Sequence, residues 1–279
     1  MRFAIKTAPQ HTTFADIIEV WRGADDIDLF ESAWTFDHFY PIFSDSTGPC
    51  LEGWLTTTAL AQATRRLRVG VLVTGNVYRH PAVLANMAAT LDHISGGRLE
   101  LGIGAGWNEQ EYDAYGIELP PLKERFDRFD EATEIIVKLL TETEADFEGR
   151  YYRLKAARCE PKPVQRPHPP IVIGGLGERR TLRTVARWAD HWNFPSGGVE
   201  VFEKKRRVLL EHCEVVGRDP AEITTSTHLR IDPANVGAVT DQAAAFADAG
   251  LDLGIVSLQP PHTPAVLGPL AEALAPLAG

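Results

Sequence analysis

The sequence has 279 residues, of which 44% are hydrophobic and 24% charged, and its formal net charge is −10. This length suits one large α/β barrel or two ordinary domains, and the hydrophobic content is sufficient for a substantial core. The negative charge argues against binding to nucleic acid or to an anionic membrane surface, because both require basic patches. No stretch is long enough to cross a bilayer, and no apolar signal region follows Met1.

The cysteines and histidines give no sign of a metal site. Cys50, Cys159 and Cys213 lie far apart in the chain. Their spacing matches no metal-binding pattern, and no two histidines stand in an H-x-x-x-H or H-E-x-x-H arrangement. We therefore expect a cytoplasmic protein with reduced thiols and no bound metal.

Strand and helix patterns alternate through the first part of the chain. Apolar runs typical of buried parallel strands occur at Phe3–Lys6, Leu29–Thr35, Leu67–Thr74 and Leu99–Ile103. Helices are predicted between them, over residues 13–21, Leu51–Thr64 and Pro81–Ile94. Thr13 is a suitable N-cap for the first helix, and Pro81 suits the first position of the third.

The same alternation continues after a long connection over residues 105–125. An amphipathic helix is predicted at Arg125–Leu140, followed by a small hairpin at Phe147–Leu154. Further strands are predicted at Ile171–Ile173, His191–Phe194, 224–231 and Leu253–Leu258. The helices predicted with them cover Arg179–Ala189, 199–216, 239–249 and a final segment near Pro264–Leu277.

Eight strands alternating with about eight helices predict a closed (β/α)8 TIM barrel. A doubly wound open sheet is the alternative, but no G-x-G-x-x-G follows the first predicted strand. The sequence contains no repeat, linker or low-complexity tract. We therefore expect residues 1–279 to form a single domain.

Glycine-rich or polar clusters follow several of the predicted strands. They are Asp37-His38, Thr74-Gly75-Asn76, Gly104–Glu109, Gly174–Glu178 and Asn193. In a parallel barrel the loops after the strands face one pocket, so these clusters are expected to meet there. Each cluster also has a plain structural explanation as a helix cap, a turn or a buried amide. Their joint occurrence at strand ends favours a binding site.

The glycines and aromatic side chains in these clusters suit a flat, anionic ligand. Gly106 and Trp107 would offer close backbone approach and an aromatic wall. The side chain of Asn193 would form a hydrogen bond to a heterocyclic ring of the ligand. The Gly174–Gly177 segment, with Leu176 inside it, precedes a predicted helix, where free backbone N–H groups form an anion site. A phosphate group is therefore expected at this loop.

These segments together resemble the luciferase-like monooxygenase superfamily, in its branch of oxidoreductases that use the deazaflavin coenzyme F420. The resemblance covers roughly residues 1–230 and is carried by four segments. They are FESAWTFDHFYPIFSD, ATRRLRVGVLVTGNVYRHPAVLANMAATLDHISGGRLELGIGAGWNE, ERFDRFDEA and PPIVIGGLGERRTLRTVARWADHWN. It implies a (β/α)8 barrel that binds its cofactor at the carboxyl ends of the strands.

The resemblance also implies roles for individual residues. His38 matches the histidine that acts in proton transfer or stabilises charge on a substrate oxygen, and Asp37 matches an aspartate that contacts the deazaflavin. Val71-Leu72 matches a bulge that carries a non-proline cis peptide in several members. The remaining positions implied or predicted to bind the cofactor are Thr74, Asn76, Gly106, Trp107, Asn108, Gly174, Gly175, Leu176, Gly177 and Asn193.

One departure from the family pattern narrows the expected activity. In F420-dependent glucose-6-phosphate dehydrogenases a glutamate follows the glycine pair, whereas here Trp107 and Asn108 stand there. This argues against sugar-phosphate oxidation. We expect an F420-dependent oxidoreductase that exchanges a hydride with a small organic substrate. The alternatives are an FMN-dependent monooxygenase using reduced flavin and O2, and a cofactor-binding protein without turnover.

A homodimer is also implied by the resemblance. In many relatives the second and third helices make the dimer contact, to which Leu60, Leu84 and Met87 would contribute here. No nucleic acid or membrane partner is expected.

Overall fold

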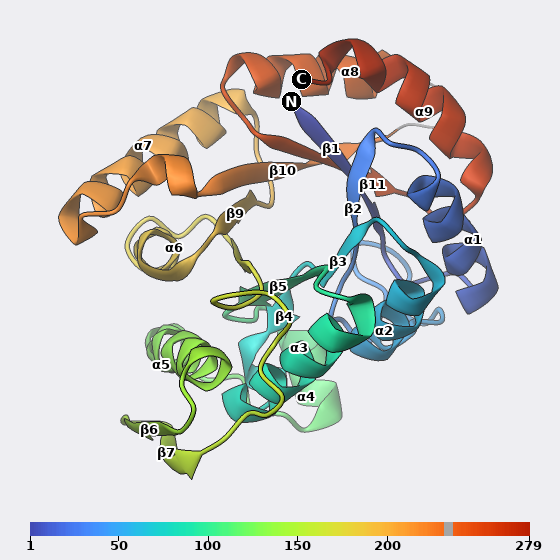
Figure 1. Cartoon of the computed structure of the whole chain (residues 1–279). Helices are drawn as coiled ribbons and strands as arrows, with labels where there is room; N and C mark the ends of the chain where they lie inside the picture. Colours follow the sequence, from blue (N-terminus) through green and yellow to red (C-terminus); the bar gives the residue numbers. More distant parts are fainter. Residues whose placement is uncertain (232–236) are drawn as a thin grey trace.

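Eight parallel strands close into a barrel in the computed structural model, which describes residues 1–231 and 237–279 (Figure 1). In order around the barrel they are β1 (Arg2–Thr7), β2 (Phe30–Thr35), β3 (Arg68–Val71), β5 (Leu99–Gly104), β8 (Ile171–Gly174), β9 (His191–Phe194), β10 (Thr224–Arg230) and β11 (Leu253–Leu258). Pairing of β3 with β5 and of β11 with β1 completes the ring. The predicted (β/α)8 barrel is confirmed.

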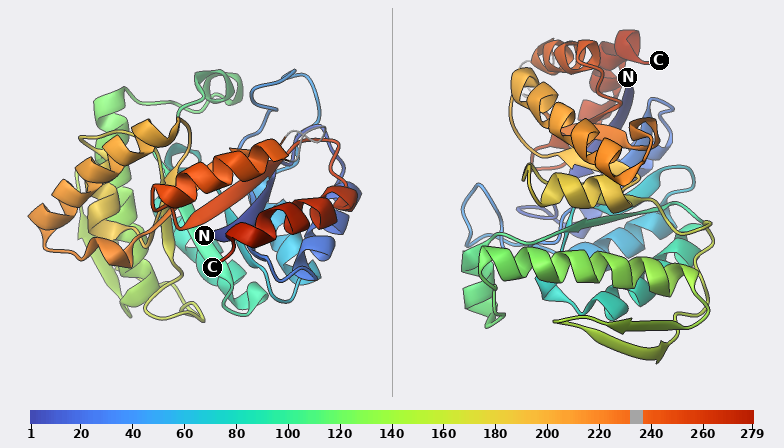
Figure 2. Two further views of the ribbon diagram at one scale, coloured as in Figure 1. Left: turned by 90° about the horizontal axis from the view of Figure 1, so that it is seen from above. Right: turned by 90° about the vertical axis from the view of Figure 1, so that its left-hand side faces the viewer.

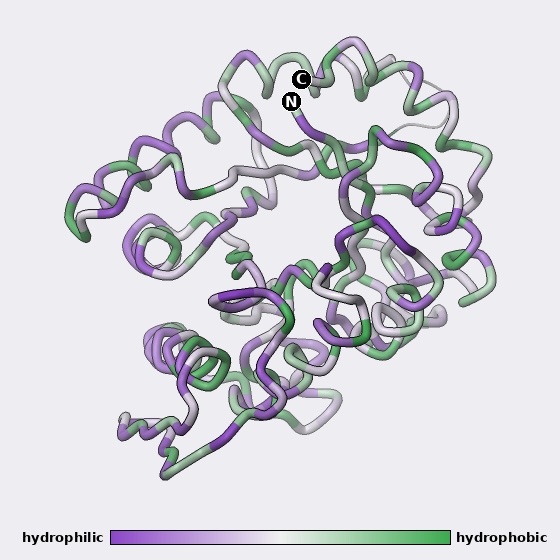
Figure 3. Tube along the Cα trace, in the orientation of Figure 1, coloured by the Kyte–Doolittle hydropathy of each residue, from purple (hydrophilic) through white to green (hydrophobic). Residues whose placement is uncertain are grey.

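Helices surround the barrel on its outer side, as Figures 1 and 2 show. They are α1 (Phe14–Asp25), α2 (Gly53–Ala63), α3 (Pro81–Ser95), α5 (Leu122–Thr141), α6 (Thr181–Trp188), α7 (Val199–Val216), α8 (Gly237–Asp248) and α9 (Leu267–Leu274). Hydrophilic and hydrophobic residues alternate along these helices, because only one face of each packs against the strands (Figure 3). Within the described residues, no helix combines the length and the apolar character needed to cross a membrane.

The structure differs from the sequence prediction mainly around the connections. The segment predicted as a long connection contains a helix, α4 (Glu109–Tyr115), which ends at Gly116 in the left-handed conformation. The third predicted strand is interrupted, because β3 ends at Val71 and a two-residue strand, β4 (Thr74–Gly75), follows. The predicted hairpin is formed by β6 (Ala145–Glu148) and β7 (Arg153–Ala157), which lie beside α5.

The predicted helix boundaries at Thr13 and Pro81 are confirmed. Thr13 forms a capping box with Asp16, whose carboxylate accepts from the Thr13 backbone N–H. Pro81 occupies the first turn of α3. The last predicted helix is instead divided into three short elements. They are the 3₁₀ turn η3 (Pro264–Val266), the helix α9 and the 3₁₀ turn η4 (Ala275–Leu277).

Alternation along the strands divides the core into two layers. On β1, Phe3 and Ile5 pack against the helices, whereas Ala4 belongs to a smaller cluster inside the barrel with Trp34. Lys6 has the same parity as Ala4 and lines the cavity at the end of the barrel. This alternation brings the charged side chain of Lys6 into the interior of the barrel.

Two residues proposed for a dimer contact are not available for it. Leu60 and Leu84 are 0% and 2% exposed within this chain and belong to the layer between the helices and the strands. The resemblance implies a dimer contact through the second and third helices, but Leu60 of α2 and Leu84 of α3 lie on the faces of these helices that cover the barrel. Only Met87 of the three is partly exposed.

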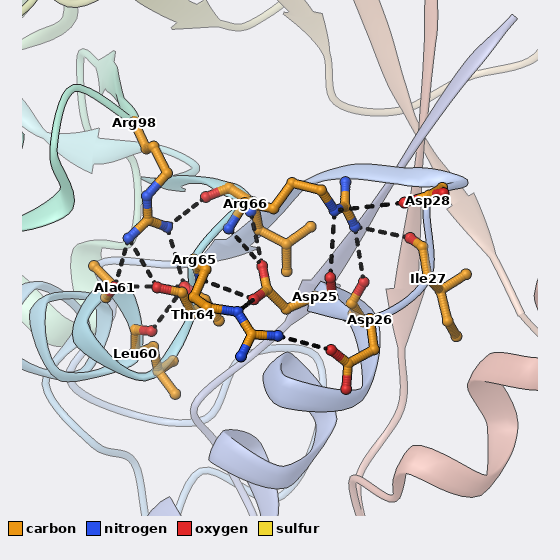
Figure 4. Close-up of polar contacts among 12 residues, drawn as sticks. Asp25, Asp26, Ile27, Asp28, Leu60, Ala61, Thr64, Arg65, Arg66 and Arg98 are labelled. Atoms are coloured by element: carbon orange, nitrogen blue, oxygen red, sulfur yellow. Dashed lines mark hydrogen bonds and ion pairs between the residues drawn. The ribbon is translucent and has the colours of Figure 1, made fainter.

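A dense polar network closes the amino-terminal end of the barrel (Figure 4). The Arg98 guanidinium donates to the carbonyl oxygens of Ala61, Thr64, Leu67 and Ser95 and to the Thr64 hydroxyl. The Asp25 carboxylate accepts from the backbone N–H groups of Arg65, Arg66 and Leu67, at 2.8 to 2.9 Å. These bonds join the ends of α1 and α2 to the start of β3, so the barrel is fixed firmly at this end.

Candidate active site

A cavity of about 810 Å³ opens at the carboxyl ends of the barrel strands. This is the end at which barrel enzymes place their active sites. It brings together nine of the predicted site residues, which are Asp37, His38, Leu72, Thr74, Gly106, Trp107, Gly174, Gly175 and Asn193. The clusters that follow β2, β3, β5, β8 and β9 therefore meet in one place, as the barrel prediction required.

The floor of this cavity is apolar and has little side-chain bulk. Leu72 and Val73 line it, together with Gly104 and Gly174. A Cβ at Gly104 would lie 2.7 Å from Val73 Cγ2, and one at Gly174 would lie 3.2 Å from Val73 Cγ1. Gly104 is thus required by the close approach of Val73, whereas a side chain at Gly174 would displace Val73 by only a few tenths of an ångström. The cis peptide expected between Val71 and Leu72 lies one residue further on, between Leu72 and Val73.

His38 forms a close pair with Glu111, a buried residue of α4. His38 Nδ1 lies 2.7 Å from Glu111 Oε2, and the Glu111 side chain is 0% exposed. The other carboxylate oxygen of Glu111 accepts from the backbone N–H groups of Phe39 and Tyr40, and Oε2 also accepts from the Tyr78 hydroxyl. Because Nδ1 is bonded to Glu111, only Nε2 of His38 remains for a ligand in the cavity.

The electrostatics of Glu111 follow from these contacts. Burial opposes ionisation, but the hydrogen bonds from His38, Tyr40 and Tyr78 outweigh it, so the pKa of Glu111 lies below its usual value. The carboxylate is therefore ionised at neutral pH and accepts the Nδ1 proton of His38. His38 also contacts the edge of Trp107, with ring centroids 5.5 Å apart.

Asp37 lies in the cavity wall but its carboxylate is bonded to the protein. Its two oxygens accept from Arg79 at 2.6 and 2.8 Å, and Oδ2 also accepts from the backbone N–H of Gly75. Arg79 in turn donates to Glu52 at 2.9 Å. The pair ties the end of β2 to the segment that precedes α3. Asp37 would consequently act on a ligand through this pair rather than as a free carboxylate.

Five predicted site residues lie outside the cavity lining. Val71 and Leu176 pack with the outer core. Gly177 lies against Thr181, whose Oγ1 would be 2.8 Å from an added Cβ. Asn76 is buried, and Asn108 occupies the position before α4 without a side-chain capping bond. Strand alternation explains why Val71 does not line the cavity, because its neighbour Leu72 occupies the inward position.

The glycine loop after β8 retains the features expected of an anion site. No hydrogen bond found among the described residues uses the backbone N–H of Leu176 or Gly177. Two of the adjacent arginines are already paired, because Arg180 bonds to Asp127 and Asp130, and Arg183 bonds to Asp130. A phosphate at this loop would thus be held by backbone donors before α6.

Sequence reasoning missed Glu111, Val73 and Lys6. Glu111 was hidden because residues 105–125 carried no recognisable helix, although three acidic residues cluster at 109–113. Val73 lay within a predicted continuous strand, so its exposure at the interruption could not be foreseen. Lys6 was visible as the only charge in an apolar strand, which is a usable signal of an inward-facing functional residue.

A closed (β/α)8 barrel with a cavity at its carboxyl end, lined by a histidine that a buried glutamate holds in place, is the arrangement of a barrel enzyme. The family follows from the sequence: residues 1–268 match the luciferase-like monooxygenase family, and the chain belongs to it. This family comprises oxidoreductases and monooxygenases.

Several relatives share about a third of their residues with this chain. An F420-dependent glucose-6-phosphate dehydrogenase of Amycolatopsis mediterranei is 35% identical over 220 residues, covering 77% of this chain and 64% of that protein. An uncharacterized protein of Mycobacterium tuberculosis is 32% identical over 201 residues, covering 72% and 67%. An FMNH2-dependent dimethylsulfone monooxygenase of Pseudomonas putida is 33% identical over 139 residues, covering 50% and 38%. The predicted resemblance to the F420-dependent branch is confirmed.

Solved structures with the same fold include enzymes of both cofactor types. An F420-dependent secondary alcohol dehydrogenase with an F420-acetone adduct has a TM-score of 0.82 at 19% identity, covering 92% of each chain. A coenzyme F420-dependent tetrahydromethanopterin reductase from Methanopyrus kandleri has a TM-score of 0.84 at 19% identity, covering 100% and 99%. A type II Baeyer-Villiger monooxygenase from Pseudomonas putida in complex with FMN has a TM-score of 0.76 at 18% identity, covering 100% and 98%. At these identities the likeness is one of fold.

Proposed function

We propose that this protein is an F420-dependent oxidoreductase acting on a small organic substrate. The observation that carries the proposal is the His38–Glu111 pair beside a glycine-floored cavity of about 810 Å³. Such a cavity admits a flat cofactor with a substrate stacked on it. The relatedness to F420-dependent glucose-6-phosphate dehydrogenases favours the deazaflavin over other flat cofactors.

The residues present fit a flat ring with a phosphate-bearing tail. Val73, Gly104 and Gly174 would support one face of the ring, since a side chain at either glycine would fill the floor. The backbone donors at Leu176 and Gly177 would hold the phosphate. When bound, the deazaflavin would supply hydride exchange at its C5.

His38 would handle the proton that accompanies this exchange. Its Nδ1 is bonded to the ionised Glu111, which favours the tautomer with the proton on Nδ1 and leaves Nε2 able to accept a proton from a substrate hydroxyl. In the reverse direction the protonated ring would donate from Nε2 to a substrate oxygen. Glu111 would stabilise the charged form of the ring and fix its orientation, acting as a positioning residue.

Turnover assays test this proposal directly. The full chain would be incubated anaerobically with oxidised F420 and a panel of alcohols, and with reduced F420 and a panel of enones, while cofactor absorbance is followed. We expect a redox change with at least one substrate class, and loss of that change in His38→Ala. Absence of any change in both directions, despite tight F420 binding, would favour a binding protein without turnover.

An FMN-dependent monooxygenase is the second candidate, favoured by the similarity to the dimethylsulfone monooxygenase of Pseudomonas putida. The same floor and phosphate loop would accept FMN. Reduced FMN with O2 and the same substrate panel tests it, with oxygenated product as the readout. Product formation with FMN and none with F420 would replace the first proposal by the second.

A further inference from the structure

The wall of the cavity formed by β1, β10 and β11 carries positive charge without matching carboxylates. Lys6, His228 and Arg230 line it. Among the described residues that line the cavity, Asp37 is the only carboxylate, and its two oxygens are bonded to Arg79. The whole chain has a net charge of −10, so a cationic wall in this cavity is opposite in sign to the charge of the chain as a whole.

The ammonium group of Lys6 is partly buried and makes few contacts within the protein. Within the described part of the chain its Nζ makes one hydrogen bond, to the carbonyl oxygen of Leu72 at 3.4 Å, and no ion pair. An ammonium group offers three donors, so two remain for a ligand. The strand register places Lys6 opposite Ser257 of β11 on one side and Trp34 of β2 on the other, neither of which carries charge.

His228 completes the wall beside Lys6. Its Nδ1 lies 3.3 Å from the Ser257 hydroxyl. Burial, followed by the positive charges of Lys6 and Arg230, lowers the pKa of His228 well below its usual value, so the ring is neutral at pH 7. When Ser257 donates to Nδ1, Nε2 of His228 carries the proton and is a further donor. The wall therefore presents donors from two strands.

We propose that Lys6 and His228, the latter oriented by Ser257, form a subsite for a carboxylate of the substrate, so that the enzyme acts on a small organic acid. This rests on the proposed function, because the acid would be the molecule that exchanges the hydride. A carboxylate needs several donors and a compensating charge when it leaves water, and this wall offers both. His38 lines the same cavity, so the subsite would hold the substrate at its acid end while the reacting oxygen meets His38.

Calorimetric titration of the full chain with benzoate and with benzamide tests the subsite. The two probes have similar shape and differ in charge. We expect benzoate to bind at least about tenfold more tightly at pH 7, the effect of one charge-assisted contact. Lys6→Met should remove this difference, and Lys6→Arg should retain most of it. Lys123→Met, at an exposed lysine paired with Asp127, is the matched control and should change neither affinity.

The pH dependence gives an independent readout. Burial lowers the pKa of Lys6 to about 8. The other ionisable groups on this wall are His228, neutral above pH 7, and Arg230, charged throughout, and benzoate is ionised over the whole range. Benzoate affinity should therefore fall by about tenfold between pH 7 and pH 9 in the wild type, and stay flat in Lys6→Met.

Titration of the wild type and of Lys6→Met with F420 distinguishes failure of the subsite proposal from failure of the proposed function. Unchanged F420 affinity in Lys6→Met, with lost preference for benzoate, supports the substrate subsite. A tenfold loss of F420 affinity in Lys6→Met, with equal binding of benzoate and benzamide to the wild type, assigns the wall to the cofactor and overturns the proposal. If benzoate is preferred but F420 does not bind, the subsite stands and the proposed function fails.

Discussion

The charged groups at the amino-terminal end of the barrel are fully hydrogen-bonded within the chain, whereas some polar groups at the carboxyl end keep spare donors or acceptors. At the amino-terminal end Arg98 donates to four carbonyl oxygens and a hydroxyl, and the Asp25 carboxylate accepts three backbone N–H groups. At the carboxyl end Lys6 makes one hydrogen bond of 3.4 Å, and His38 offers Nε2 to the cavity. The polar residues of the amino-terminal end precede the barrel strands, and those of the carboxyl end lie in the strands' last residues or follow them.

The difference indicates what each end is for. Hydrogen bonds that are complete within the chain hold the fold together, because each buried group has exchanged water for a protein partner. Groups left with spare donors or acceptors gain nothing for the fold and suit a ligand instead. Changes at the amino-terminal end should therefore affect stability, and changes at the carboxyl end should affect binding and turnover.

The largest effect is expected for His38→Ala. Loss of a general acid or base lowers the rate by about 10²–10⁴-fold. Because His38→Ala also removes one donor from the buried Glu111 carboxylate, the free energy of unfolding should fall by about 1–2 kcal/mol, a smaller effect than the loss of turnover. Steady-state turnover and a denaturation curve measure the two effects. Undiminished turnover in His38→Ala would remove the histidine from the mechanism.

Asp25→Ala tests the amino-terminal end of the barrel. Three backbone N–H groups lose their charged acceptor, which should lower the free energy of unfolding by about 3 kcal/mol. Cofactor affinity of the folded fraction should be unchanged. Urea denaturation followed by circular dichroism measures the loss. A stable variant with impaired cofactor binding would contradict the division between the two ends.

We also expect the free energy of unfolding to depend on pH through the Asp25 carboxylate. Burial opposes ionisation of Asp25, but the backbone donors and Arg66 outweigh it, so its pKa is lowered in the folded protein. Its contribution to stability is therefore complete above the unfolded pKa of about 3.9 and is lost as the pH falls below that value. Denaturation curves between pH 7 and pH 3 should show a steeper decline in the wild type than in Asp25→Ala.

Glu111→Gln probes the positioning of His38. The amide oxygen can still accept from the backbone of Phe39 and Tyr40, but its NH2 group would face His38 Nδ1 and favour the opposite tautomer. We expect turnover to fall by about 10–100-fold, with a changed pH profile and the stability nearly retained. A change in KM alone would indicate that Glu111 supports the cavity wall and does not orient His38.

Lys6→Met sharpens the comparison, because removing a charge here should stabilise the fold. The folded pKa of about 8 lies below the unfolded value, so the protonated lysine destabilises the folded protein at pH 7. The variant should gain about 1–3 kcal/mol at pH 7, and the gain should shrink as the pH rises above 8. Thermal denaturation at pH 7 and pH 10 measures both. A loss of stability at pH 7 would show that the ammonium supports the barrel.

The smallest effect is expected for Phe43→Ala. Phe43 is 92% exposed and stacks on Trp107 at the cavity, with ring centroids 5.8 Å apart. The backbone beside it is held by Gln10, which bonds to both polar groups of Ile42. Loss of the ring should raise KM by about 2–10-fold through the lost contact, with kcat and stability unchanged. An altered kcat would instead give Phe43 a part in the chemistry.

The sequence was sufficient for the barrel and for nine residues of the cavity lining. Strand alternation and the clusters after β2, β3, β5, β8 and β9 identified His38, Trp107 and Gly174 because parallel strands bring their carboxyl ends together. The cis peptide was expected between Val71 and Leu72 but lies between Leu72 and Val73. The sequence could not locate it, because the end of β3 at Val71 leaves no mark in a continuous apolar run.

The rest depends on contacts between distant segments. Glu111 meets His38 across 73 positions of the chain, and no local pattern reports such a contact. The arginine pair of Asp37 is similar, because Arg79 looks like an ordinary residue before a helix. The resemblance implies that Leu60 and Leu84 contribute to a dimer contact, but it does not report which face of each helix packs on the barrel, and both side chains are buried within the chain.

The central claim is that the carboxyl end of this barrel binds F420 in preference to FMN. Equilibrium titration of the cofactor-free protein with each cofactor, followed by tryptophan fluorescence, tests it most directly, because Trp107 lines the cavity. The account predicts micromolar or tighter binding of F420 and binding of FMN at least about tenfold weaker, a free-energy difference of about 1.4 kcal/mol. Tighter binding of FMN, or binding of neither cofactor, would contradict it.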